Sequence, residues 1–148
     1  MCFRGCLFLT LTCLPIAAVA GDWLAAQQWQ RRPVLVDEAL APAVEATLAP
    51  HAAALRERRM SVWRWDGESL NWMGGMPALA VGEVSGLSTA GLRQALARAK
   101  PRPGLHLFGL DGGLKASRSG VDPLQELIDA VDSMPMRVRE TRASSASE

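Results

Sequence analysis

The chain has 148 residues, a formal net charge of +1 and a hydrophobic content of 49%. A chain of this length forms one small domain with a modest core. A charge this close to zero excludes the bulk electrostatic attraction that draws strongly basic proteins to nucleic acid or to anionic lipid. We therefore expect no nucleic-acid partner.

The first 20 residues are expected to form a cleavable export signal. Arg4 supplies its positive charge, residues 6–18 supply its apolar stretch, and Ala18-Val19-Ala20 is a small-x-small cleavage site. Cleavage after Ala20 would deliver a mature chain to the periplasm or the exterior. The apolar stretch is too short for a comfortable membrane span, so we expect no stable span after cleavage. The alternative is an uncleaved signal anchor.

All three cysteines, Cys2, Cys6 and Cys13, lie within this expected signal. The processed chain would then contain no thiol. That excludes disulfides, cysteine nucleophiles, thiolate metal sites and CxxC redox chemistry in the mature protein.

The first half of the mature chain predicts a strand, a helix and a second strand. The all-apolar run 33–36 is typical of a strand buried on both faces, as in a parallel sheet. Residues 42–59 are rich in alanine and predict a helix, which Pro50 should kink or divide in two. Residues 60–65 have strand composition. Residues 71–86 favour no particular element.

The middle of the chain predicts a helix followed by a hairpin. Residues 88–100 carry one apolar stripe, and Ser88 stands where it can cap the helix. Residues 105–110 are apolar on both faces and indicate a central strand. The turn signal Asp111-Gly112-Gly113 and the returning strand 114–117 complete the hairpin.

The last predicted helix covers residues 123–133. Asp122 is expected to cap it, and Gln125 to reach back and complete the capping arrangement. Pro135 should end it, because proline disfavours helical geometry in the preceding residue. Residues 142–148 have no apolar anchor and are expected to be disordered.

This order of elements predicts an α/β fold. Alternating strands and helices, then a hairpin and a final helix, indicate a compact thioredoxin-like sandwich with a central mixed sheet. We expect a single domain over residues 21–141.

Two segments carry a resemblance to a known family. The first contains Asp111-Gly112-Gly113 and Lys115, and the second runs from Asp132 to Glu140 through Met134-Pro135-Met136-Arg137. Together they resemble the bacterial domain-of-unknown-function family 4174, with its Asp-Gly-Gly-x-Lys hairpin and its Asp-x-Met-Pro-Met-Arg-x-x-Glu ending. The resemblance spans about residues 23–140.

The resemblance implies a fold and a location but no established activity. The family is similar to a peroxiredoxin-like, thioredoxin-fold domain of vertebrate extracellular proteins that contain sushi repeats and coiled coils. This sequence departs from the family at Leu110, where a lysine is frequent, and at Met60, where an Arg-Asp pair is common.

The candidate site residues each allow a functional and a structural interpretation. Asp111-Gly112-Gly113 could cradle a phosphate, but such a loop should open into a helix, so a structural turn is favoured. Lys115 could bind an anion or act as a catalytic amine, or it could be a solvated residue of an edge strand. Asp132 and Asp129 could do acid–base work if buried together, and otherwise only solubilise a helix face.

The run Met134-Pro135-Met136-Arg137 also allows two interpretations. The methionines, beside Arg137, could hold a peptide or ligand. The favoured alternative is structural: the methionines fill gaps, and Arg137 and Glu140 pair with each other or cover helical carbonyls.

These observations predict an exported binding module without redox cysteines, whose partner is a protein or peptide of the cell envelope. No cofactor and no metal are expected. The alternative is a cysteine-independent enzyme or a divergent oxidoreductase-like protein, which would use Lys115, Asp111 or Arg137.

Overall fold

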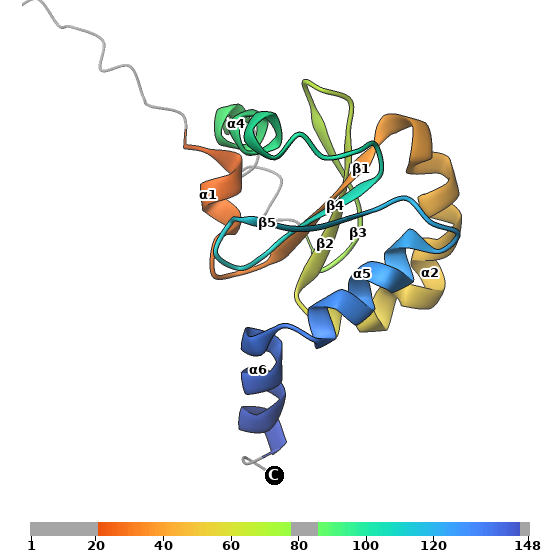
Figure 1. The fold of residues 1–148 in the computed structure, drawn as a ribbon, viewed down its shortest axis with the longest axis vertical. Coiled ribbons are helices and arrows are strands. Elements are labelled where there is room, and N and C mark those ends of the chain that lie inside the picture. Colours follow the sequence, from red (N-terminus) through yellow and green to blue (C-terminus); the bar gives the residue numbers. More distant parts are fainter. Residues whose placement is uncertain (1–20, 78–85, 146–148) are drawn as a thin grey trace, which may run out of the picture.

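The computed structural model describes residues 21–77 and 86–145, so the expected export signal lies outside the described residues. Helices lie on both faces of one β-sheet (Figure 1). In chain order the elements are α1 (Trp23–Gln27), β1 (Arg32–Asp37), the 3-10 turn η1 (Glu38–Leu40), α2 (Ala41–Glu57), β2 (Met60–Trp65), β3 (Leu70–Gly75), α4 (Ala90–Ala99), β4 (Leu105–Phe108), β5 (Leu114–Arg118), α5 (Pro123–Asp132) and α6 (Pro135–Ser145).

The sheet is mixed, with the strand order β3-β2-β1-β4-β5. Strand β1 is parallel to β2 and antiparallel to β4, and the remaining pairs are antiparallel. Val34, Leu35 and Val36 are fully buried in the central strand β1. The prediction of a two-sided buried strand at 33–36, and that of a mixed α/β fold, are confirmed.

Two apolar clusters flank the sheet. Helices α2 and α5 pack on one face against strand residues such as Val34, Val36 and Leu107. Helices α1 and α4 cover the other face (Figure 1). There Trp23 meets Trp63 edge to face, with ring centroids 5.3 Å apart. This alternation of side chains along each strand buries both faces of the sheet.

Helix α2 is one continuous element. The sequence predicts either a kink at Pro50 or a division into two helices, and the division is wrong, because one helix runs from Ala41 to Glu57. Pro50 lies on the exposed side, while Val44, Leu48 and Leu55 pack into the core on both sides of it. Burial of that continuous apolar stripe offsets the cost of proline in a helix interior.

The helix caps are partly as predicted. Asp122 accepts a hydrogen bond from the Gln125 N–H at 3.1 Å and caps α5, as expected. Gln125 does not reach back, because its amide donates to Asp129 at 2.7 Å. At the start of α4, Ser88 Oγ accepts from the Ala90 N–H, and a second acceptor comes from the distant residue Asp22.

The C-terminal region also differs from its prediction. Residues 142–148 are expected from the sequence to be disordered, but helix α6 runs from Pro135 to Ser145, so residues 142–145 are helical. Residues 146–148 lie outside the described residues. Proline suits the first turn of a helix, so Pro135 begins α6 after α5 has ended. The hydroxyls of Thr141 and Ser145 bond to carbonyls one turn earlier. Across residues 21–77 and 86–145, no helix is long and apolar enough to cross a membrane.

Candidate functional site

The two segments that the sequence singled out meet at one pocket. The β4–β5 turn forms one wall, and the junction between α5 and α6 forms the other. The pocket has a volume of about 210 Å³ and an apolar interior with charged groups around it. Its lining residues are Arg32, Gly109, Leu110, Asp111, Lys115, Met134, Pro135 and Met136.

The turn at Asp111-Gly112-Gly113 is closed by its own hydrogen bonds. The Gly112 N–H donates to the Gly109 carbonyl at 3.0 Å, and the Gly113 N–H donates to Asp111 Oδ1 at 3.0 Å. Gly112 has a φ of +77°, a left-handed conformation that favours glycine. Because these N–H groups are already bonded and a strand follows, this loop acts as a structural turn.

Lys115 is paired with the carboxylate of the turn. Its Nζ lies 2.6 Å from Asp111 Oδ2, and both side chains are partly exposed. Partial burial opposes the charged form of Asp111, but the hydrogen bonds from Lys115 and Gly113 outweigh it and lower the pKa of that carboxyl. The pair therefore places a positive and a negative group together at the pocket.

The Met134-Pro135-Met136 run supplies the apolar wall opposite the turn. Met134 is partly buried and packs against the core on the α2 and α5 side of the sheet. Met136 remains 39% exposed. Met134 therefore fits the structural interpretation, in which a methionine fills a gap, and Met136 fits the interpretation in which an exposed methionine contacts a peptide or ligand.

Arg137 is turned away from solvent and holds α6 to the end of α2. It donates to the Glu57 carboxylate at 2.5 Å and to the Glu57 carbonyl at 3.3 Å. Asp132 and Glu140 lie 3.7 and 3.8 Å from its guanidinium nitrogens. These contacts join the first turn of α6 to the C-terminal end of α2.

Arg32 is a pocket residue that sequence reasoning missed. Its side chain is only 1% exposed. The guanidinium donates to both Glu140 oxygens, at 3.1 and 3.4 Å, and to the Arg58 carbonyl at 2.8 Å. An arginine at the start of a strand is ordinarily exposed, and here the bonds to the distant Glu140 and to the Arg58 carbonyl make its burial favourable.

The two aspartates of α5 do not form an acid–base pair. Asp132 is bonded to Arg58, and Asp129 accepts from Gln125. The hydrogen bonds from Arg58 hold the pKa of Asp132 below its usual range against a smaller opposing effect of burial. Both side chains are exposed, so they act as surface groups.

The sequence profile of one protein family, described as a domain of unknown function (DUF4174), matches residues 23–140. The chain belongs to this family. No curated protein and no solved structure matches it.

In this DUF4174 domain the pocket stands apart from the histidines. His51 bonds to the Thr47 carbonyl and to Gln125, and His106 is buried in β4. Within the described ranges, no group of three or more His, Cys, Asp or Glu side chains could hold a metal ion. Five of the sequence-predicted site residues line the pocket: Asp111, Lys115, Met134, Pro135 and Met136. The other five are not among its lining residues: Gly112, Gly113, Asp132, Arg137 and Glu140.

Proposed function

We propose that this chain is an exported binding module whose pocket accepts an apolar side chain of a protein or peptide of the cell envelope, without catalysis at that pocket. The observation that carries the proposal is the meeting of the turn around Asp111 with the run Met134-Pro135-Met136 at one pocket.

The size of the pocket favours a side chain over a cofactor. Its volume of about 210 Å³ lies below the ~300–1,000 Å³ typical of small-molecule sites. A methionine wall adapts to ligands of different shape because its side chains are flexible and polarizable. The Lys115–Asp111 pair beside it offers a donor and an acceptor to a peptide backbone.

Strand order supports a thioredoxin-like fold for the module. Strands β2, β1, β4 and β5 are neighbours in that order, with β1 and β2 parallel and β4 and β5 forming a hairpin. This is the order expected of a thioredoxin-like core, with β3 added at one edge. A crystal structure whose core strands superpose on those of a thioredoxin would support this assignment, and a different strand order would contradict it.

Peptide selection tests the proposed binding function. We expect peptides selected from a displayed random library to share an apolar residue and to bind at least tenfold more weakly to Met136→Asp. The matched control is Val121→Asp, since Val121 is fully exposed and lies outside the pocket. Equal binding to the wild type and both variants would contradict the proposal.

Export is tested separately by expressing the full chain in a bacterium and fractionating the cells. The proposal expects a periplasmic product whose N-terminal residue is Gly21. A product that keeps residues 1–20 and sediments with the membrane would favour a signal anchor instead.

A further inference from the structure

A buried histidine at the far end of the sheet links a carboxylate to a serine. His106 Nδ1 lies 3.0 Å from Ser117 Oγ, and His106 Nε2 lies 3.5 Å from Asp37 Oδ1. These three residues come from β4, β5 and β1. They lie at the end of β1 opposite Arg32, and therefore away from the pocket of the proposed function.

The sheet register places the three side chains on one face. Leu35 pairs with His106 across β1 and β4, and His106 pairs with Ser117 across β4 and β5. Asp37 follows Leu35 by two residues, so its side chain points to the same face. The carboxylate is also fixed, because its Oδ2 accepts from the Gly104 N–H at 2.7 Å.

From this geometry we propose that Ser117 is a nucleophile, that His106 is its general base and that Asp37 is a positioning residue in an esterase site. A serine, a histidine and a carboxylate in hydrogen-bonded sequence define such a site by geometry, whatever their order in the chain.

The proposed role requires one tautomer of His106. With the proton on Nε2, the ring N–H faces the Asp37 carboxylate at 3.5 Å, and the lone pair on Nδ1 faces the Ser117 hydroxyl at 3.0 Å. The side chain is 4% exposed, and this burial lowers the pKa of His106 in spite of the opposing carboxylate. The ring is therefore neutral and able to accept a proton at neutral pH.

Ser117 is the accessible member of the group. It is half-buried and lines two cavities, of about 370 and 230 Å³. Arg102 and Arg118 line the larger cavity. Arg118 is paired with Glu126 at 3.4 Å, whereas Arg102 adds positive charge that favours a substrate with an anionic group. The inferred substrate class is a small ester that carries a carboxylate.

The reaction balances with water as the second reactant. Ser117 Oγ attacks the ester carbonyl carbon and forms an acyl–oxygen bond, while its proton moves to His106 Nδ1. The same proton passes to the leaving alkoxide, which departs as an alcohol. Water then attacks the acyl carbon while His106 Nδ1 takes one of its protons. The bond between the acyl carbon and Ser117 Oγ breaks, His106 returns the proton to Ser117 Oγ, and a carboxylic acid leaves.

A fluorophosphonate probe tests the nucleophile. With the purified full chain we expect one covalent adduct, formed by loss of fluoride, and peptide mapping should place it on Ser117. Ser117→Ala should abolish the adduct. Ser119→Ala is the matched control, since Ser119 lines the same cavity, and it should be labelled like the wild type. Absence of an adduct, or an adduct on another residue, would overturn the proposal.

The rate of probe labelling tests the role of His106, and the rate of ester hydrolysis tests the role of Asp37. His106→Gln should slow labelling at least a hundredfold, and Asp37→Asn should lower kcat for 4-nitrophenyl succinate with little change in KM. The kcat/KM for 4-nitrophenyl succinate should also exceed that for the neutral ester 4-nitrophenyl butyrate. If His106→Gln fails to fold, the wild type in urea serves instead, because labelling that persists in the unfolded chain would overturn the proposal.

Discussion

Arg58 and Asp132 form a two-point ion pair that joins the end of α2 to the end of α5. Arg58 Nε lies 2.7 Å from Asp132 Oδ1, and Nη2 lies 2.8 Å from Oδ2. Planar, two-point pairing is the geometry in which an arginine–carboxylate pair is strongest. The hydrogen bonds to Asp132 also raise the pKa of the Arg58 guanidinium against the opposing effect of burial.

Asp132→Asn is expected to lower the free energy of unfolding by about 1 kcal/mol at pH 7, the upper end for a partly exposed pair. Because the pKa of Asp132 is lowered in the folded state, its stabilising contribution is present above the ordinary aspartate pKa and is lost as the pH falls through the folded value. Urea unfolding at pH 7 and in acid measures both effects. Asp129→Asn is the control, and an equal loss in that variant would contradict the expectation.

Gly75→Ala is expected to lower the free energy of unfolding by several kcal/mol, on the order of twice the loss expected for Gly67→Ala. Both glycines have positive φ, +84° and +99°, so alanine is strained by roughly 1–2 kcal/mol at either position. A Cβ on Gly75 would in addition collide with the Met60 carbonyl oxygen, whereas a Cβ on Gly67 meets nothing within 4 Å. Urea midpoints compare the variants, and equal destabilisation would show that the collision is relieved.

Asp22→Ala is expected to destabilise the fold by about 2 kcal/mol, compared with about 1 kcal/mol for Asp122→Ala. Asp22 Oδ1 accepts from the Ala25 N–H at the start of α1, and its Oδ2 accepts from the Gly91 N–H at the start of α4. Asp122 caps only α5. Thermal and urea unfolding of the two variants measure the difference, which would vanish if either bond of Asp22 contributed nothing.

Stability is expected to rise with pH up to about pH 6.5 because of His106. Burial lowers the pKa of this histidine, which faces Asp37 and Ser117. Between the folded pKa and the ordinary value of 6.5, the unfolded chain binds more protons, so the free energy of unfolding increases with pH and then levels off. Unfolding of the wild type and His106→Gln from pH 5 to 8 tests this. A slope of the same size in the variant would contradict it.

The sequence predicts the elements whose local signals agree with their packing. Strand β1 follows from an apolar run that needs two covered faces, and α5 from Asp122, Pro123 and the apolar spacing behind them. Strand β3 could not be predicted, because its glycine-rich segment forms a strand only by pairing with β2, as Trp72 does with Trp63. Helix α6 was missed because Arg137 holds it to Glu57, which is 80 residues away.

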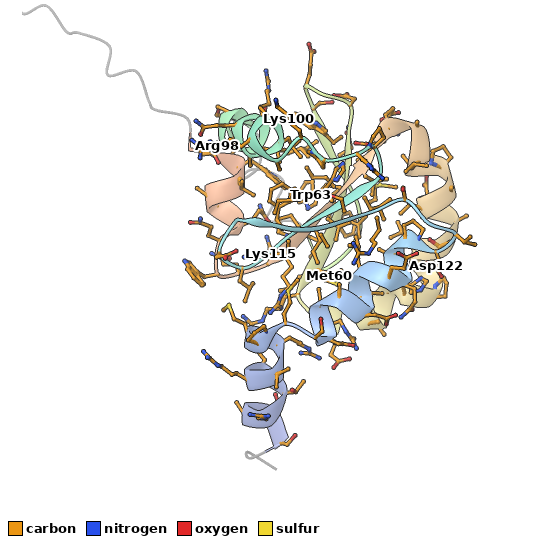
Figure 2. All side chains as sticks on the ribbon, viewed as in Figure 1. Met60, Trp63, Arg98, Lys100, Lys115 and Asp122 are labelled. Atoms are coloured by element: carbon orange, nitrogen blue, oxygen red, sulfur yellow. The ribbon has the colours of Figure 1, made fainter. Side chains whose placement is uncertain are left out.

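The candidate site was predictable in its parts but not as a whole. The turn at Asp111 and the run at Met134 each stood out in the sequence. Their meeting at one pocket depends on the path of α5 across the sheet, which no local pattern encodes. Figure 2 shows Lys115 among the side chains between the sheet and α6. The burial of Arg32 likewise depends on Glu140, 108 residues further along the chain.

The cap that Asp22 provides to α4 has a consequence for the order of folding. Asp22 and Gly91 are 69 residues apart, and contacts across such long loops are entropically costly to form early. We therefore expect this bond to be absent from the rate-limiting transition state. Its removal should speed unfolding while leaving the folding rate almost unchanged. The hydrogen bond between Asp22 and Gly91 would therefore form late in folding and would set the unfolding rate, and with it the lifetime of the folded state.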